Sequence, residues 1–143
     1  VSFNEVMDNN LTLLSDYVES RNVKLFKKLS EDVKIKIDVR KFYVACYYIA
    51  RFACDIMKQG GNLYFSSQVE NTTVVLNIKD GNKINSKDLL ENVFDPGFTN
   101  NTNESVGLSL AIAKFIIESM NGWITLQNAE SGTSYLVSIP ISS

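Results

Sequence analysis

The chain has 143 residues, of which 45% are hydrophobic and 21% charged, and its formal net charge is −2. This length suffices for one domain with a substantial core. The balanced charge argues against a nucleic-acid-binding protein, which would need a basic face. The longest apolar run, residues 42–57, is interrupted by Arg51, so we expect no direct membrane insertion.

The sequence contains no histidine. The commonest general base and any phosphate-accepting histidine are therefore missing, and no group of thiols or carboxylates has metal-ligand spacing. Cys46 and Cys54 would lie about 12 Å apart along one helix, beyond the roughly 7 Å that a disulfide allows. Two thiols in apolar surroundings predict a reduced, cytoplasmic protein. Because the sequence begins at Val1 with no signal-peptide pattern, we expect it to be part of a longer chain.

In the first half of the chain, apolar residues at steps of four and three predict an amphipathic helix over residues 3–18. Residues 23–29 and 33–38 alternate apolar and charged side chains on either side of a polar turn, which predicts a hairpin. Asp38 is the predicted N-cap of a second helix. That helix should end at the glycine pair 60–61.

In the second half, residues 62–70 and 72–80 predict a hairpin around Asn71. A short helix should start at residue 85 or 86, and a longer one should follow Gly107 and end at Gly122. Two closing strands, 123–129 and 134–141, should pair. The predicted fold is a single α+β domain over residues 1–143. It should form a two-layer sandwich with helices on one face of a mixed, mostly antiparallel sheet of about five strands.

Four segments, in order and at matching spacings, resemble the ATP-binding catalytic domain of sensor histidine kinases, in the GHKL superfamily. They are residues 1–25, 35–65, 76–99 and 106–141. The resemblance implies that ATP lies between the helices and the sheet under a flexible lid. It also implies that glycines near the last helix bring backbone amides to the phosphates, where a helix N-terminus favours anions.

The second predicted helix departs from this family. Where the family has two asparagines and a basic residue for Mg²⁺ and phosphate, the gapless register places Tyr48, Phe52 and Asp55. Mg²⁺ requires oxygen ligands, which Phe52 lacks, and Asp55 would bring negative charge toward a triphosphate. As alternatives, Phe52 is a core residue, Tyr48 a surface aromatic and Asp55 a solvated charge.

The first glycine-rich segment is also altered. Residues 80–84 keep Asp80, which in the family recognises the adenine amino group. Compared with the family pattern, however, Gly81 is out of place and the segment that ends at Ile84 is one residue short. Thr133 matches a family threonine near adenine. The alternative for Asp80 is a simple turn residue, and for Thr133 a β-branched residue that opens a strand.

The second glycine-rich segment keeps Gly107 and Leu108, while Ser109 replaces a glycine that allows close approach of the phosphates. Residues 99–105, in the expected lid, lack the lysine that several family members carry there.

Three hypotheses remain open. The first is a pseudo-kinase with weak ATP or ADP binding and without Mg²⁺. It would act by docking on upstream dimerisation and phosphoacceptor helices or on a response regulator. The second is an active, divergent kinase domain that phosphorylates a histidine on a separate dimerisation domain. The third is a module that binds a small ligand in a more apolar pocket.

Overall fold

The computed structural model describes residues 1–95 and 104–142, and the side chains within these ranges except those of residues 104–107. The helices are α1 (Phe3–Ser20), α2 (Val39–Ile56), α3 (Lys87–Asn92) and α4 (Glu104–Ser119). The strands are β1 (Val23–Lys28), β2 (Gly61–Glu70), β3 (Thr73–Asp80), β4 (Trp123–Ala129) and β5 (Gly132–Pro140).

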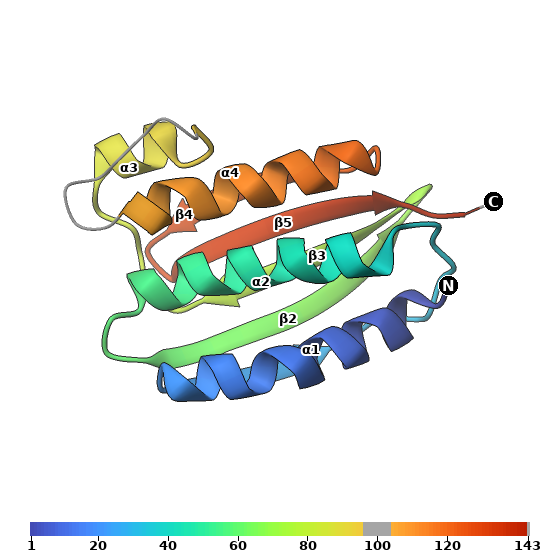
Figure 1. The fold of residues 1–143 in the computed structure, drawn as a ribbon, viewed down its shortest axis with the longest axis horizontal. Coiled ribbons are helices and arrows are strands. Elements are labelled where there is room, and N and C mark those ends of the chain that lie inside the picture. Colours follow the sequence, from blue (N-terminus) through green and yellow to red (C-terminus); the bar gives the residue numbers. More distant parts are fainter. Residues whose placement is uncertain (96–103, 143) are drawn as a thin grey trace.

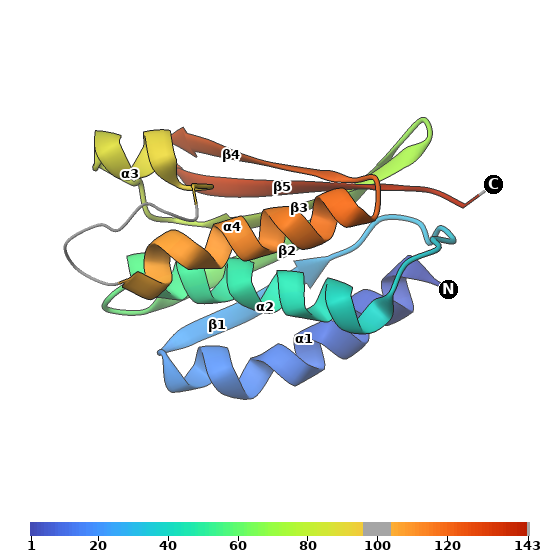
Figure 2. The same ribbon diagram turned by 45° about the horizontal axis from the view of Figure 1, so that its top comes forward.

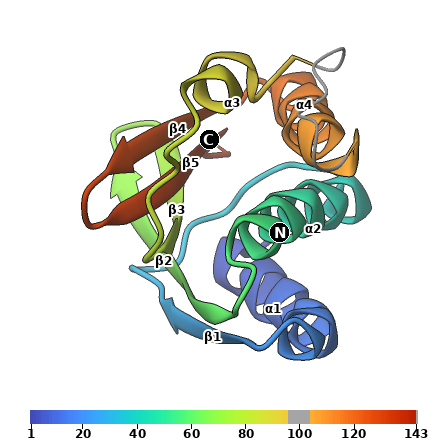
Figure 3. The ribbon, with the colours of Figure 1, turned by 90° about the vertical axis from the view of Figure 1, so that its left-hand side faces the viewer.

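The strands form one mixed sheet in the order β1-β2-β3-β5-β4. Strand β1 runs parallel to β2, and every other neighbouring pair is antiparallel. Helices α1, α2 and α4 lie side by side over one face of the sheet (Figure 1 and Figure 2), and an end-on view separates this layer from the sheet (Figure 3). The predicted two-layer α+β sandwich is confirmed.

The helices begin where polar side chains satisfy free backbone N–H groups. Asp38 accepts hydrogen bonds from the N–H groups of Arg40 and Lys41, as predicted. Ser2 caps α1 in the same way, and Ser86 caps α3 by accepting from the Leu89 N–H. The predicted start of the short helix is therefore confirmed.

The core lies between the helix layer and the sheet. The predicted apolar stripe of α1 is buried throughout. The stripe of α2 formed by Phe42, Ala45, Ile49, Phe52, Ala53 and Ile56 is buried except for the half-buried Ile56. None of the described helices is long and apolar enough to cross a membrane. The largest fully buried side chains are Tyr135, Phe3, Phe42, Phe52, Phe65, Met7, Leu14, Ile35, Ile49, Leu63, Leu76 and Ile78.

Both hairpins of the second half are confirmed, whereas the predicted first hairpin, residues 23–38, is wrong. Residues 23–28 pair in parallel with β2. The segment after them forms only single bridges, from Lys34 to Ser2 and from Ile35 to Ile141. Its polar start is tied to α1, because Asp32 accepts hydrogen bonds from the Ser2 hydroxyl and the Asn4 N–H. The alternating residues 23–28 therefore form an edge strand, and the alternating residues 33–38 belong to a connecting segment.

Two glycines of the last helix act differently from the prediction. Helix α4 already begins at Glu104, so Gly107 lies inside the helix and does not precede it. At the other end, Asn121 takes the left-handed conformation (φ 61°), and Gly122 donates its N–H to the Ile117 carbonyl. Gly122 is needed for space, because a Cβ there would stand 2.3 Å from the Ser138 carbonyl oxygen.

Candidate functional site

The candidate site lies at the end of the sheet where β3 finishes and β5 begins, near the C-terminal half of α2. Asp80, the last residue of β3, faces Thr133 of β5 across the ladder. Gly132 has φ +134°, and a Cβ there would stand 2.0 Å from the Asp80 carbonyl oxygen. Glycine at position 132 therefore lets the two strands come together behind Asp80.

Asp80 is a buried carboxyl group without a cationic partner among its described contacts. One oxygen accepts a hydrogen bond from the Asn82 N–H at 2.8 Å, and the other lies 3.4 Å from the Tyr135 hydroxyl, which donates to it. Burial raises the pKa of Asp80 to about 6, although these hydrogen bonds act in the opposite direction. The residue is thus both a turn residue, as the simple alternative supposed, and a perturbed acid of the kind found at functional sites.

The loop after β3 is held by side chains of the β4–β5 hairpin. The Asn128 amide donates to the Ile84 carbonyl and accepts from the Ile84 N–H, at 2.8 and 2.9 Å. Thr133 donates its hydroxyl to the Asn82 carbonyl at 2.8 Å and lies 3.0 Å from the Asn128 oxygen. Gly81 is exposed at the start of this loop. Thr133 and Ile84 therefore belong to one network that fixes the loop.

On α2, Phe52 is fully buried, with 0% of its surface exposed. The Phe52 ring packs edge-on against Tyr135, with ring centroids 5.9 Å apart. Tyr135 in turn reaches Asp80, so Phe52 is connected to the site through this tyrosine. Tyr48, one turn earlier, is half-buried and packs against Tyr47 at 5.3 Å. Phe52 is thus a core residue, as the alternative interpretation of this position supposed.

Asp55 is the third of the α2 positions at which the sequence differs from the family. It forms an ion pair with Arg21, which follows α1. The Arg21 guanidinium donates to the Asp55 carboxylate at 2.8 Å and to the Tyr17 hydroxyl at 2.7 Å. The Asp55 side chain is only 11% exposed, and its second oxygen has no hydrogen-bond partner among the described residues. Asp55 is therefore not a solvated surface charge, which was the alternative interpretation. Its charge is balanced by the guanidinium of Arg21, a residue that the sequence analysis did not connect to it.

The described residues of α2 do not fit a magnesium–phosphate site. Phe52 offers no oxygen ligand, and Asp55 is already engaged by a guanidinium. Within the described ranges, no three histidine, cysteine, aspartate or glutamate side chains gather as a metal-binding group.

The residues expected from the last helix separate into two environments. Ser109 is buried, whereas Leu108 is 45% exposed. Leu108 lines a groove of about 380 Å³ with Phe94 and Phe115, and no described contact joins it to Asp80 or Phe52. Gly107 lies in the first turns of α4. The expected lid, residues 99–105, falls outside the described residues and the described side chains.

The two thiols are structural. Cys46 and Cys54 are buried and unpaired. Burial raises the pKa of Cys46 to about 12 and that of Cys54 to about 11. Both groups are therefore protonated at neutral pH and poor nucleophiles.

Three residues of this region were missed from the sequence: Arg21, Asn128 and Tyr135. Asn128 carried one signal, as a polar residue inside an apolar closing strand. Arg21 and Tyr135 carried no such signal, because their partners are distant in the sequence. Arg21 binds Asp55, 34 positions away, and Tyr135 binds Asp80, 55 positions away.

The comparisons with known proteins agree with this fold. The sensor histidine kinase ZraS of Salmonella typhimurium is 26% identical over 144 residues, which cover 99% of this chain and 31% of ZraS, so the chain spans about a third of that relative. The nucleotide-free catalytic domain of the histidine kinase ThkA superposes with a TM-score of 0.82 at 24% identity, covering 98% and 94% of the two chains.

A further solved structure, ThkA in complex with the response regulator TrrA, matches with a TM-score of 0.79 at 22% identity, over 99% of this chain and 42% of that one. These likenesses establish the fold. The family model described as histidine kinase-, DNA gyrase B-, and HSP90-like ATPase matches residues 37–143. The chain therefore belongs to this ATPase family and has the fold of the catalytic domains of sensor histidine kinases.

Proposed function

We propose that this domain is a pseudo-kinase: it keeps the histidine-kinase ATPase fold, binds Mg-ATP weakly or not at all, and acts in two-component signalling as a docking module. The observation that carries the proposal is the position of Phe52. Its ring is fully buried against Tyr135, at the helix position where the family places a polar ligand. A buried hydrocarbon ring cannot replace an oxygen ligand of Mg²⁺.

The Arg21–Asp55 pair supports the same proposal. In the family, the residue at position 55 is basic and offsets phosphate charge. Here the position is acidic, and the nearby guanidinium is used to balance it. The pair therefore offers a triphosphate little net attraction.

The partners that we propose are upstream dimerisation and phosphoacceptor helices or a response regulator. This part rests on the family and on the ThkA structure that contains a response regulator. A cytoplasmic location is proposed with it, because both kinds of partner belong to that compartment and because both thiols are free.

Asp80 favours a second candidate function, metal-free binding of an adenine nucleotide or another small ligand. A buried carboxyl whose pKa is raised to about 6 is costly for the fold, and such groups concentrate at binding sites. In this candidate, Asp80 recognises a base-like donor, while the phosphate end of the pocket contributes little.

The direct test uses the complete protein that carries this domain, incubated with radiolabelled ATP, Mg²⁺ and its response regulator. The proposal predicts that neither protein takes up label. It also predicts that the isolated domain binds the dimerisation helices or the response regulator in a calorimetric titration without nucleotide. Label that depends on Asp80 would instead establish the active, divergent kinase.

A further inference from the structure

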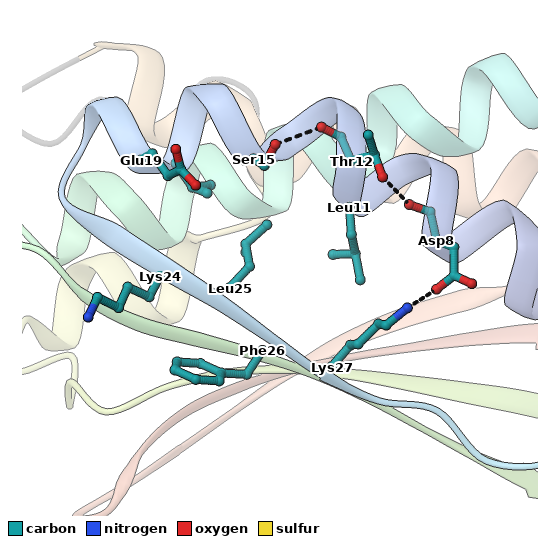
Figure 4. Close-up of a pocket in the computed structure, with 10 residues that line it drawn as sticks. Asp8, Leu11, Thr12, Ser15, Glu19, Lys24, Leu25, Phe26 and Lys27 are labelled. Atoms are coloured by element: carbon teal, nitrogen blue, oxygen red, sulfur yellow. Dashed lines mark hydrogen bonds and ion pairs between the residues drawn. The ribbon is translucent and has the colours of Figure 1, made fainter.

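The groove between α1 and the edge strand β1 is the largest of the described pockets, about 680 Å³ (Figure 4). Leu11 of α1 and Leu25 of β1 point into it from opposite sides. Asp8 and Lys27 close one end with an ion pair between helix and strand. The groove is thus bounded by a helix on one side and by a sheet edge on the other.

Strand β1 has a described hydrogen-bonded neighbour on one side only, β2. On an edge strand, half of the backbone N–H and C=O groups point away from the sheet and can pair with another strand. A sheet edge beside a helix is a geometry that accepts an extended peptide, through main-chain hydrogen bonds and pockets for alternate side chains.

The two faces of β1 present different chemistry. Toward the helices, Leu25 offers an apolar surface inside the groove. On the open face of the sheet, Phe26 stacks on Tyr64 at 5.0 Å, and both rings are 45% exposed. Lys24 and Lys28 flank Phe26 on this face. Both lysines are exposed, and neither forms an ion pair with a described carboxylate.

We propose that β1 binds an extended acidic segment of a partner protein as an additional strand of the sheet. The segment would carry an acidic residue opposite Lys24, an apolar or aromatic residue opposite Phe26 and an acidic residue opposite Lys28. Small apolar side chains between them would enter the groove beside Leu25. This surface is distinct from the Asp80 region, so the inference stands whether or not nucleotide binds.

Charge selects this occupant over a second copy of the chain. If two β1 strands paired across a two-fold axis, lysines of one copy would face lysines of the other, and like charges directly opposite destabilise a strand pair. Lysines on an edge commonly protect it from self-association. The same lysines attract an acidic strand.

The probe is a fluorescent peptide with the palindromic order Thr-Glu-Val-Tyr-Val-Glu-Thr, which presents the same pattern in either strand direction. Three control peptides accompany it: one with both glutamates replaced by lysine, one of shuffled order, and one with N-methylated backbone amides. Binding is measured by fluorescence anisotropy, and hydrogen exchange of the β1 amides is followed in parallel.

We expect the acidic peptide to bind in preference to all three controls and to slow exchange of amides in β1. Lys24→Glu with Lys28→Glu should weaken binding about tenfold, as two lost cross-strand charge pairs imply, and should create binding of the lysine peptide. The matched variant Lys36→Glu with Lys87→Glu makes the same change of net charge at exposed positions outside β1, and it should bind the acidic peptide like the wild type.

Four results would overturn the proposal. They are equal binding of the shuffled or N-methylated peptide, equal weakening in the matched variant, no detectable binding, and unchanged exchange in β1. Sedimentation that reveals a dimer paired through β1 would overturn it as well, because a second copy would then occupy the edge.

Discussion

Replacement of Asp80 by asparagine should make the domain more stable at neutral pH. The pKa of Asp80 is raised from 3.8 to about 6, because the carboxyl group is buried. This difference of about two pH units corresponds to about 3 kcal/mol at 1.36 kcal/mol per unit. The folded state binds the proton more tightly than the unfolded state, so the contribution of Asp80 to stability is greatest in acid and is lost as the pH rises from about 4 to about 6.

The amide of Asp80→Asn is uncharged at every pH and can still accept the Asn82 N–H. The pKa of about 6 already includes the hydrogen bonds that the carboxylate accepts, so we expect a gain of up to about 3 kcal/mol in the free energy of unfolding at pH 7.5. Near pH 4.5, the wild-type carboxyl group is protonated in the folded state, so most of the gain should disappear.

Urea denaturation of both proteins, followed by circular dichroism at pH 7.5 and 4.5, measures this difference. Asp16→Asn, an exposed carboxylate of α1, is the control and should change little. An effect of Asp80→Asn that is the same at both pH values, or a variant that is less stable than the wild type at pH 7.5, would contradict this prediction.

Three further experiments, which use four substitutions, test the contacts around the site by urea denaturation. Phe52→Ala should lower the free energy of unfolding by about 3–5 kcal/mol, since it empties a buried aromatic position; a loss below 1 kcal/mol would mean that Phe52 is not packed as described. In a double-mutant cycle, Arg21→Leu and Asp55→Leu should couple by about 1–2 kcal/mol, whereas additive effects would argue against a bond between them. Thr133→Val removes the hydroxyl that is bonded to the Asn82 carbonyl and should cost about 1–2 kcal/mol; no loss would show that this bond does not hold the loop.

The fold was largely predictable, because most of its signals are local. The caps at Asp38 and Ser86, the turn at Asn71 and the apolar stripes of α1 and α2 each depend on residues within a few positions. The prediction of the first hairpin was wrong because alternation of apolar and charged residues indicates a strand but not the strand with which it pairs. Strand β1 pairs with β2, which begins at Gly61 in register with Val23.

The helix that carries Phe52 and Asp55 was predictable from the sequence, but the contacts of these residues were not. The resemblance to the family could not show that Arg21 balances the charge of Asp55. The contact of Asn128 was also not predictable: its amide, in the β4–β5 hairpin, holds Ile84 in the loop after β3. These contacts depend on the packing of separate elements, which periodicity and propensity do not encode.

The most direct test of the central claim is a calorimetric titration of the wild-type domain with ATP, in the presence of Mg²⁺ and in the presence of EDTA. If α2 supplies no metal ligand at Phe52 and no free cation near Asp55, magnesium should leave the affinity for ATP unchanged, whether that affinity is weak or absent. Tight binding that requires Mg²⁺ would contradict this account.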